Sequence, residues 1–538
     1  MLDRRRFLVS AAAGAAGAPL FCKDLLAGAA ATAPQLSSQL VYNVKNYGAT
    51  GSKQDDARPA LQQAIDACGK SGGGTVYLPP GEYTSGQLHL RSGVRLYLEA
   101  GATLFASPEG RQFDPPPKSA LLIGEDLHDI ALEGRGTIDG QASYKWQPND
   151  FNDFYIRPNQ LQMEAAGKPL IRAFPAGYPT ETVNPRLVLL LRCQDVRIAG
   201  LKFIRSRSWT INPYACKRLV IDGVYIYSSA KEGVWADGFD PDGCQDVRVA
   251  NSTIDTGDDA IVLWSSNTWG PALPTENVTV TNCRLSSASS ALKFCDGNSN
   301  AVRRVSVDNV VITNSNRGLA FMVFDGGVVE DVVISNVSIE TRRFDWFWWG
   351  DGDPIHFNIK RRSEIDGTKR DHEPPAGKIR NVSISNVIAH CTGTSAINGH
   401  PDSWLENIHL DNVRLFVAHD PAAPYESTRT AIALRQARNF SIKDSQIRWE
   451  QPHSATWQSG LTAEDVEDLR LDTVDVEAAP ASTAPVIELT NATKATLQSL
   501  RAETIHLAGK ATREIRLLQT DAKISADSDV SKDAVLRQ

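Results

Sequence analysis

A short repeat recurs along most of this chain and limits what the chain can fold into. Each unit has a short alternating strand, a turn at Asn or Asp and a second short strand, as in Cys-Gln-Asp-Val-Arg-Ile-Ala-Gly-Leu-Lys-Phe at 193–203. Most unit starts are 23 to 32 residues apart, and one gap is 50 residues. Units begin at Cys193, Cys216, Cys244, Thr275, Val302, Val329, Ile379, Leu405, Ala437 and Val466. Alternating strands at this period indicate a stacked array, in which each unit buries its apolar face with its neighbours.

The number of strands in a unit separates two stacked folds. A β-propeller needs about four strands in each blade of about 40 residues, whereas these units offer two or three strands in about 27 residues. The pattern therefore favours a parallel β-helix, an all-β solenoid that can absorb most of the 538 residues as one domain. We predict one β-helix domain over 34–524, an aromatic-rich insertion loop at 341–378 and a polar, frayed end at 525–538.

The first 33 residues are typical of an export signal. Arg-Arg-Arg-Phe-Leu at 4–8 precedes an Ala/Gly-rich run, which is the pattern of a twin-arginine signal; an ordinary secretory signal is the alternative. The mature protein is then expected in the periplasm or outside the cell. Loss of 1–33 would change the formal charge from −7 to −9, which does not favour nucleic-acid binding. No run of 18 apolar residues occurs, so we expect no membrane span.

The segment 40–106 is predicted to begin the solenoid. Asp55 and Asp56 can cap a helix that runs to about Cys68, with Leu61 and Ile65 on its apolar face. Such a helix would cover the open edge of the first coil. Seven cysteines follow the signal segment, and their odd number and spacing suit neither a disulfide framework nor a zinc site. We expect buried thiols instead.

Two acidic motifs stand in adjacent repeat units. Asp237 lies in Trp-Ala-Asp-Gly-Phe-Asp-Pro, and Asp258 and Asp259 lie in Thr-Gly-Asp-Asp-Ala-Ile, twenty-one residues later. Stacking brings such motifs to within one or two coil spacings of about 4.8 Å. Glycoside cleavage needs one carboxylic acid and one carboxylate, and mutual repulsion should leave one of these acids protonated near neutral pH. A turn or bulge must re-aim one of the adjacent pair, because neighbours in a regular strand point to opposite faces.

The ordered motifs resemble glycoside hydrolase family 28, the polygalacturonase-like pectin hydrolases, in a bacterial branch. The resemblance covers roughly 42–350 and includes Pro-Pro-Gly-Glu-Tyr at 79–83, Gly-Arg-Gly-Thr-Ile-Asp-Gly-Gln at 134–141, Ser-Trp at 208–209 and the two acidic motifs. It implies a right-handed, pectin-lyase-like parallel β-helix that hydrolyses with inversion and needs no metal or cofactor. It also implies that Asp258 is the general acid and that Asp237 and Asp259 hold and activate the water.

Three positions depart from the family pattern. Trp-Ala replaces Asn-Thr before the first acid, and Ser-Ser-Ala at 289–291 stands where Gly-His-Gly is usual. Ala320 and Met322 stand in place of the basic pair of Arg-Ile-Lys, which binds a sugar carboxylate in the family. Lys293 and Arg317 are close in sequence and are predicted to replace those groups, although either could be a solvated edge residue. The predicted substrate-binding residues are Lys293, Arg317, Trp209, Trp235 and Ser290.

The sequence thus predicts an exported, monomeric glycoside hydrolase of the polygalacturonase type, acting on pectic or related plant polysaccharides or oligosaccharides. A β-helical polysaccharide lyase remains an alternative, with calcium held by several of the acids at 237, 240, 242, 258 and 259 and Lys293 or Arg317 as base. A non-catalytic glycan-binding solenoid is a second alternative. The aromatic segment 344–356 suits either a sugar-binding wall or a packed cluster. The sugar, the linkage and endo or exo action stay open.

Overall fold

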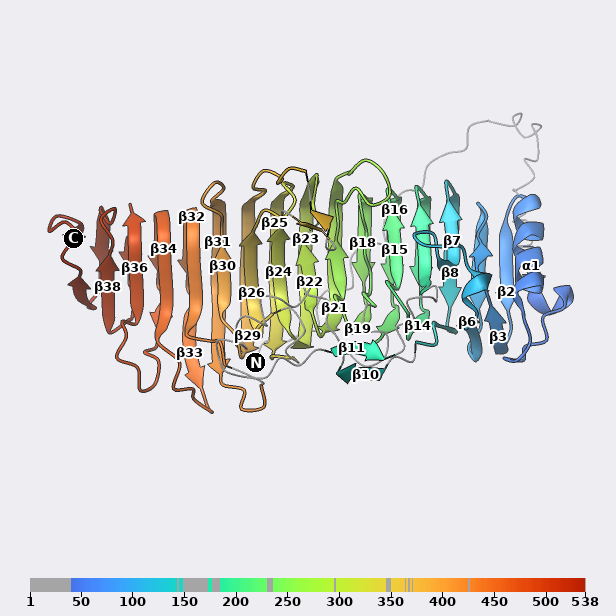
Figure 1. Ribbon diagram of the computed structural model, residues 1–538, viewed down its shortest axis with the longest axis horizontal. Coiled ribbons are helices and arrows are strands. Elements are labelled where there is room, and N and C mark those ends of the chain that lie inside the picture. The colour runs from blue at the N-terminus through green and yellow to red at the C-terminus, as the bar shows by residue number, and fades with distance from the viewer. Residues whose placement is uncertain are drawn as a thin grey trace, which may run out of the picture. The chain divides into compact units, whose positions relative to one another are not determined.

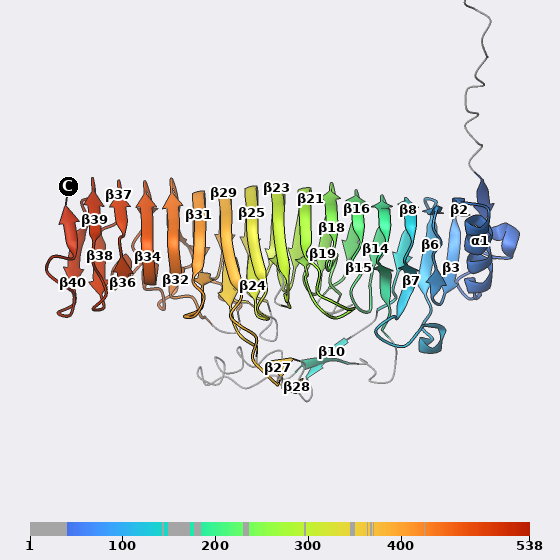
Figure 2. The ribbon, with the colours of Figure 1, turned by 90° about the horizontal axis from the view of Figure 1, so that it is seen from above.

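The computed structural model describes residues 40–142, 145–148, 173–176, 184–229, 236–294, 297–344, 350–362, 364–365, 368–369, 371–423 and 426–537. Residues 40–538 make up one compact unit. Figures 1 and 2 show this unit as parallel β-strands stacked coil upon coil, with helix α1 at its N-terminal end. The predicted all-β fold, a right-handed parallel β-helix with an N-terminal capping helix, is confirmed.

The strands form three parallel ladders. The first ladder contains β1 Val41–Asn43, β2 Gly74–Leu78, β5 Val94–Leu98, β8 His128–Gly134, β13 Gln194–Ala199, β16 Lys217–Asp222 and β18 Gln245–Ala250. It continues through the first halves of β21 Thr275–Ser287, β23 Ala301–Ser315, β25 Val328–Thr341, β29 Lys378–Cys391 and β31 Leu405–Ala418. The second halves of β32 Thr430–Lys443 and β34 Ser459–Asp472 follow in the same ladder.

The second ladder contains the next strand of each coil. Its separate strands are β3 Gly81–Ser85, β6 Ala102–Ala106, β9 Thr137–Asp139, β14 Lys202–Ile204, β17 Tyr225–Tyr227, β19 Thr253–Thr256, β33 Gln446–Glu450 and β35 Asp475–Val476. The second halves of β21, β23, β25, β29 and β31 complete it.

The third ladder carries the candidate site. It contains β4 Leu88–His89, β7 Ala120–Glu125, β12 Arg186–Leu191, β15 Ile211–Tyr214, β20 Ile261–Leu263, β22 Ser290–Phe294, β24 Arg317–Val323, β26 Asp353–Ile359 and β30 Ser395–Asn398. The first halves of β32 and β34 follow, and then β36 Ile487–Thr493, β38 Thr504–Ala508 and β40 Lys523–Ala526. Further short elements are η1 Val44–Tyr47, η2 Gly110–Gln112, β37 Thr496–Gln498, β39 Ile515–Leu518 and β41 Val535–Arg537. Two antiparallel pairs, β10 Lys145–Pro148 with β11 Ala173–Ala176 and β27 Glu364–Ile365 with β28 Thr368–Lys369, lie off the stacked ladders (Figure 2).

Asparagines make the corners between the first and second ladders. Asn251, Asn282 and Asn309 have φ of 54°, 53° and 54°, in the left-handed region that asparagine tolerates better than most residues. Their side chains also bond along the stack: Asn282 Nδ2 donates to Asn251 Oδ1 at 3.3 Å, and Asn309 Nδ2 donates to Asn282 Oδ1 at 2.7 Å. The Asn that marks the bend in each repeat therefore sets both the turn and the alignment of the coils.

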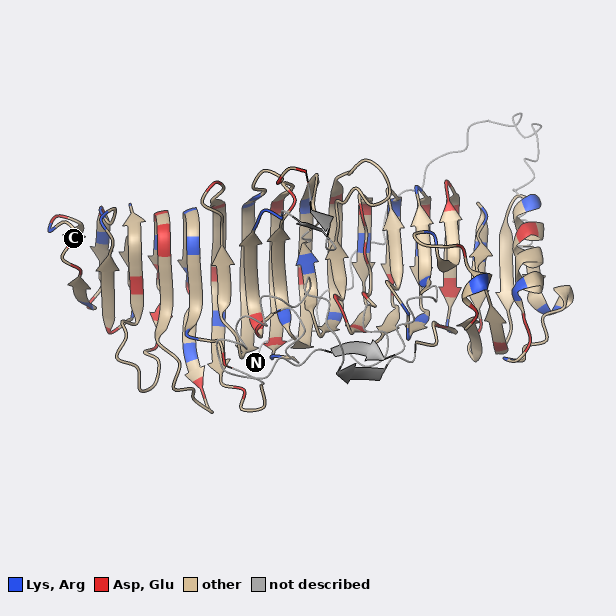
Figure 3. Cartoon of the chain, in the orientation of Figure 1, with Lys and Arg blue, Asp and Glu red and all other residues tan. Residues whose placement is uncertain are grey.

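Charged side chains on the outer face of the first ladder alternate in sign from coil to coil. The alternating residues in register are Glu276, Arg303, Glu330, Arg380, Glu406, Arg438 and Glu467. Two of the resulting ion pairs join Arg303 Nε to Glu276 Oε2 at 2.8 Å and Arg380 Nη2 to Glu330 Oε2 at 2.6 Å. Acidic and basic residues accordingly occur together along the strands (Figure 3).

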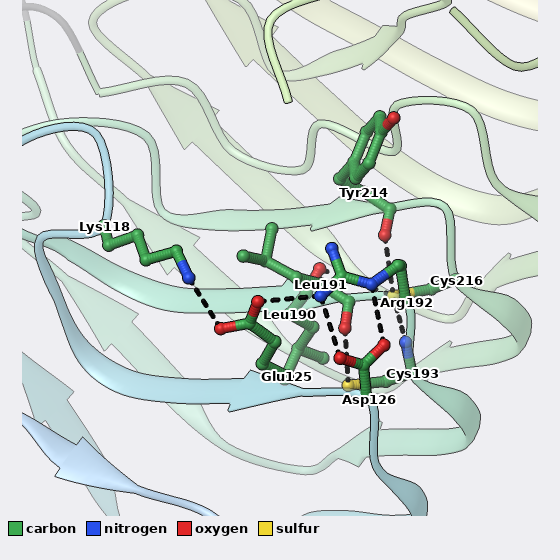
Figure 4. A network of polar contacts seen from close by, with 9 residues as sticks. All are labelled: Lys118, Glu125, Asp126, Leu190, Leu191, Arg192, Cys193, Tyr214 and Cys216. Carbon is green, nitrogen blue, oxygen red and sulfur yellow. Dashed lines mark hydrogen bonds and ion pairs between the residues drawn. The ribbon is translucent and has the colours of Figure 1, made fainter. Parts of the chain in front are cut away.

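The interior is a continuous apolar stack with buried thiols. Phe294, Phe321 and Phe357 belong to successive coils of the third ladder, and their rings stack at centroid distances of 4.2 Å. The cysteines in the described part of the chain are free and buried. Cys193 and Cys216 follow β12 and β15, where each thiol donates to a backbone carbonyl, and Arg192 in the same corner pairs with Glu125 and Asp126 (Figure 4).

The N-terminal helix covers the first coil, as predicted. α1 Arg58–Lys70 buries Ala60, Leu61, Ala64, Ile65 and Cys68. Its capping differs from the expectation, because the residue at the cap is Ala57 and only Asp56 accepts a bond from the helix, from Arg58 N at 2.9 Å. Asp55 instead accepts from Thr50 Oγ1 at 2.7 Å. None of the helices in the described part of the chain is long and apolar enough to cross a membrane.

Two segments contain more regular structure than their sequences suggested. The segment 341–378 holds β26, which pairs in register with β24, so a regular coil runs through the predicted insertion loop. Its aromatic core at 345–349 lies outside the described residues. The polar end at 525–538 contains β41, which pairs with β39, and Ala534 just before β41 is buried. Polar composition hides these strands because only their few inward positions need apolar side chains.

Candidate active site

Seven successive coils of the third ladder are in register at the beginning of their strands. The inward residues Ile211, Phe239, Ile261, Leu292, Leu319 and Ile355 are in register and buried. Two positions earlier in sequence, the same coils carry Trp209, Asp237, Asp259, Ser290, Arg317 and Asp353. In the coil before Trp209, Val188 pairs with Ile211, so Arg186 occupies the equivalent position. We call these seven residues the site column. The register therefore brings Asp237 beside Asp259, in neighbouring coils.

A bend between β19 and β20 presents both members of the second acidic motif. Asp258 and Asp259 lie between these strands, and the Asp258 carbonyl accepts from Thr256 Oγ1 and from Ser287 Oγ, each at 2.6 Å. Asp258 Oδ1 accepts from the backbone N–H of Asp259 at 2.9 Å. The irregular backbone supplies the turn that the sequence required, so the two acids need not face opposite sides of a strand.

Asp259 receives a hydrogen bond on each carboxylate oxygen. Oδ1 accepts from the backbone N–H of Ser290 at 2.8 Å, and Oδ2 accepts from Lys293 Nζ at 2.9 Å. The side chains of Lys293 and Asp259 are only 13% and 3% exposed, so this is a buried ion pair. Such donors stabilise negative charge on Asp259. Lys293 is thus not a solvated edge residue.

A fourth acid stands against Asp237. Asp240 is fully buried, and neither of its oxygens, nor Asp237 Oδ1, has a hydrogen-bond donor in the described part of the chain. Burial raises the pKa of both carboxyls well above the ordinary value, and the charges of Asp258 and Asp259 raise them further. Two neighbouring carboxyls in this setting favour sharing a proton over carrying two charges.

Asp258 is the most accessible of the four acids, since its side chain is partly exposed. Burial of its carboxyl, followed by the charge of Asp259, raises the pKa of Asp258 to about 8, and Lys293 opposes the rise. Asp258 therefore holds a proton at neutral pH, next to a charged carboxylate. A proton donor beside a carboxylate is the pairing that glycosidic cleavage needs.

On the C-terminal side of the acids, Arg317 already has a partner. Its Nε lies 3.5 Å from Asp353 Oδ2 in the next coil, and its Nη1 lies 3.8 Å from Met322 Sδ. Ala320 and Met322, where the family has its basic pair, are buried and form a small apolar cluster with Phe324. Arg317 thus lies in the site column as half of a buried ion pair.

The other predicted residues have different placements. Trp209 lies in the site column and is partly buried, whereas Trp235 lies outside the described residues. The side chain of Ser290 is fully buried, and its backbone N–H takes part in the site. Sequence reasoning gave no role in hydrolysis to Arg186, Asp240, Asp353 and His356, which occupy the same end of the third ladder. Aligning the coils on their inward apolar residues is the signal that would have found them.

The acidic motifs carry several carboxylates of the kind that bind metal ions. Across the described residues, no group of three or more His, Cys, Asp and Glu side chains is arranged to hold a metal ion. The four acids instead have Lys293 and Arg186 as neighbouring cations, and both influence their pKa values.

Parts of the chain are similar to known proteins. Residues 178–343 match the family "Glycosyl hydrolases family 28", and residues 41–105 match "Rhamnogalacturonase A/epimerase, pectate lyase-like". The chain is 25% identical over 404 residues to a probable polygalacturonase of Vitis vinifera, covering 69% of this chain and 74% of that protein. A shorter stretch of 119 residues, 19% of this chain, is 50% identical to 8% of the mannuronan C5-epimerase AlgE1 of Azotobacter vinelandii.

A solved structure shares the fold. The exopolygalacturonase of Thermotoga maritima superimposes with a TM-score of 0.56 at 22% identity, covering 76% of this chain and 92% of that one. The family match spans Asp237, Asp258 and Asp259 together with the third-ladder strands that carry them. Residues 178–343 therefore resemble glycoside hydrolase family 28, and this protein is a glycoside hydrolase.

Proposed function

We propose that this protein hydrolyses glycosidic bonds in pectic or related plant polysaccharides or oligosaccharides, with inversion of configuration. Asp258 acts as general acid, and Asp237 and Asp259 hold and activate the water. The observation that carries this proposal is the accessible Asp258, whose pKa burial raises to about 8, beside Asp259, whose two carboxylate oxygens accept from Ser290 N–H and Lys293 Nζ. The probable polygalacturonase among the relatives supports a pectic substrate.

The roles follow from the environments of the acids. Asp258 is accessible and keeps its proton near neutral pH, so it can protonate the leaving oxygen. Asp259 carries negative charge, and each of its oxygens keeps a second lone pair beyond the bonds to Ser290 and Lys293. Asp237 faces Asp240 with a shared proton, so the pair carries one charge and can orient the water with Asp259.

Asp258→Asn tests the acid. It should remove nearly all turnover of an unactivated substrate, since general acid catalysis contributes about a hundredfold or more. A substrate with a very good leaving group should restore part of the rate, because it needs little protonation. Asp242→Asn is the matched control: Asp242 is a buried acid of the same motif, bonded to Ser266 N at 2.8 Å and to the Ser266 hydroxyl. Retention of more than about a tenth of the activity by Asp258→Asn would reject the assignment.

The products distinguish hydrolysis from the lyase alternative. A hydrolase leaves saturated ends of inverted configuration, which proton NMR detects, whereas a lyase leaves an unsaturated end that absorbs in the ultraviolet. Activity should persist in excess chelator. Loss of activity in chelator, restored by calcium, together with a severe effect of Asp242→Asn, would support the lyase. Binding without turnover would support the glycan-binding solenoid.

The export route and the monomeric state are part of the same proposal. Arg-Arg-Arg-Phe-Leu at 4–8 supports twin-arginine export to the periplasm or beyond. The free, buried cysteines support folding before export, in a reducing compartment. Replacing Arg4, Arg5 and Arg6 by Lys should retain the protein in the cytoplasm, and fractionation of the cells measures it.

A further inference from the structure

Arg186 is a buried cation at the N-terminal end of the site column. Only 8% of it is exposed. Its Nε donates to Asn212 Oδ1 at 3.1 Å, and its Nη1 donates to the Pro117 carbonyl at 2.9 Å. Both acceptors are neutral, and Nη2 has no hydrogen-bond partner among the described residues. A buried guanidinium is stable only when a counter-charge compensates its lost hydration.

Two indole rings fix the orientation of this guanidinium. The Arg186 Cζ lies 4.5 Å from the centroid of Trp209 and 5.3 Å from that of Trp269, and Trp264 lies 6.3 Å from Trp209, centroid to centroid. Cation–π contacts of this kind hold the planar group without neutralising it. The arrangement therefore leaves one edge of the fork available while its plane is held in place.

The nearest protein carboxyls do not bond to this guanidinium. Asp237 and Asp240 are within electrostatic reach of Arg186, but burial raises the pKa of each well above its usual range, so the pair favours sharing a proton, and the side-chain hydrogen bonds of Arg186 go to Asn212 and the Pro117 carbonyl instead. Burial accordingly lowers the pKa of Arg186 to about 10 in spite of them. The other two cations of the site differ, since Lys293 pairs with Asp259 and Arg317 lies beside Asp353.

We propose that Arg186 binds the carboxylate of a uronate residue of the substrate through Nη2. The proposal rests on the proposed function, because it names a sugar acid as the substrate of the same site. Arg186 and Trp209 stand in the coils directly before Asp237, so a sugar beside the reacting bond can place its carboxylate there. The substrate carboxylate supplies a charged hydrogen-bond acceptor, whereas the acceptors that Arg186 has among the described residues are neutral. This assigns recognition of the acid to Arg186 and not to Lys293 or Arg317.

The first test is a ratio of rates. kcat/KM is measured for an oligogalacturonide and for its carboxyl-reduced analogue, with wild type, Arg186→Gln, Arg317→Gln and Arg192→Gln. Arg186→Gln should lower the acidic-to-neutral ratio about tenfold or more, which is the usual effect of losing a hydrogen bond between charged groups. Arg192→Gln is the matched control, because this arginine follows the same strand but pairs with Glu125 and Asp126 at the corner in Figure 4. Its ratio should equal that of wild type.

Equal losses on both substrates would mean that Arg186 only supports the fold, and would overturn the proposal. A ratio that changes in Arg317→Gln but not in Arg186→Gln would overturn it as well, in favour of Arg317. If Arg186→Gln does not fold, Arg186→Lys replaces it. This variant keeps the charge but loses the planar fork, and its ratio should still fall severalfold; an unchanged ratio counts against the proposal.

Binding separates this proposal from the proposed function. Titration calorimetry of the same oligogalacturonide into Asp258→Asn should show binding that weakens about tenfold or more in Asp258→Asn/Arg186→Gln. Binding that depends on Arg186, together with a wild-type protein that hydrolyses none of the pectic substrates, would retain this proposal and reject the proposed hydrolysis. Hydrolysis of pectic substrate with an unchanged ratio and unchanged binding would do the reverse.

Discussion

Lys293→Met gives the strongest test of the charge arrangement around the acids. The variant removes the ammonium that lies 2.9 Å from Asp259 Oδ2 while keeping a side chain of similar length. Because the pair is buried, its removal leaves an uncompensated carboxylate, which costs about 3–5 kcal/mol of stability. Two charges about 4 Å apart at an effective dielectric constant of about 20 interact by about 4 kcal/mol, which agrees. For a domain of about 500 residues this corresponds to a fall in Tm of about 4 °C.

Calorimetry of wild type and Lys293→Met at pH 8 measures this fall in Tm. The double variant Lys293→Met/Asp259→Asn carries neither charge and should recover most of the stability at pH 8. A Tm of Lys293→Met equal to that of wild type at pH 8, or a double variant no more stable than the single, would refute the reasoning.

The remaining predictions use the same assays. Because Asp258 with its pKa of about 8 must be protonated to act, kcat/KM should fall as the pH rises through about 8; a rate that stays constant to pH 10 would contradict its role as the acid. That raised pKa also means that the folded state holds a proton that the unfolded chain has lost, so Asp258→Asn should flatten the decline of Tm between pH 5 and 8. Phe321→Ala should destabilise the β-helix by about 3–5 kcal/mol, since its ring is buried between Phe294 and Phe357, while Phe321→Leu keeps much of the buried volume and should cost less; equal effects would contradict buried apolar volume as the cause.

The first and second ladders could be predicted from the sequence because their corner has a chemical signature. Asn251, Asn282 and Asn309 mark the bends in the repeat, and each adopts the left-handed conformation with its side chain bonded to the asparagine of a neighbouring coil. Valine pairs such as Val247 and Val249 then mark the inward positions of the strand before the corner. Local backbone preference and burial thus agree at each coil, and the pattern persists over many copies.

The third ladder could not be predicted in the same way. The links that lead into it vary in length and carry no constant corner residue, so β26 remained hidden in what was predicted as an insertion loop at 341–378. The acids were found only because Asp258 and Asp259 are adjacent and lie twenty-one residues after Asp237. Arg186 lies 51 residues before Asp237, and no spacing rule connects them. Their proximity follows from the register of β12 with β15 and the coil beyond it.

The order of charges along the site column gives the site a direction. Coils are about 4.8 Å apart, so Arg186 stands about 10 Å before Asp237, and Arg317 stands about 10 Å after Asp259. The two guanidiniums lie at equal distances on either side of the acids, but their partners differ. Arg317 lies beside the carboxylate of Asp353, whereas the hydrogen-bond acceptors of Arg186 are neutral and its faces contact indole rings. A substrate carboxylate can therefore bind at Arg186 without displacing a protein carboxylate, whereas at Arg317 it would have to compete with one. A uronate chain should consequently be recognised over Trp209 and the coils before the acids, and the apolar cluster of Ala320, Met322 and Phe324 on the other side should add little discrimination between acidic and neutral sugars.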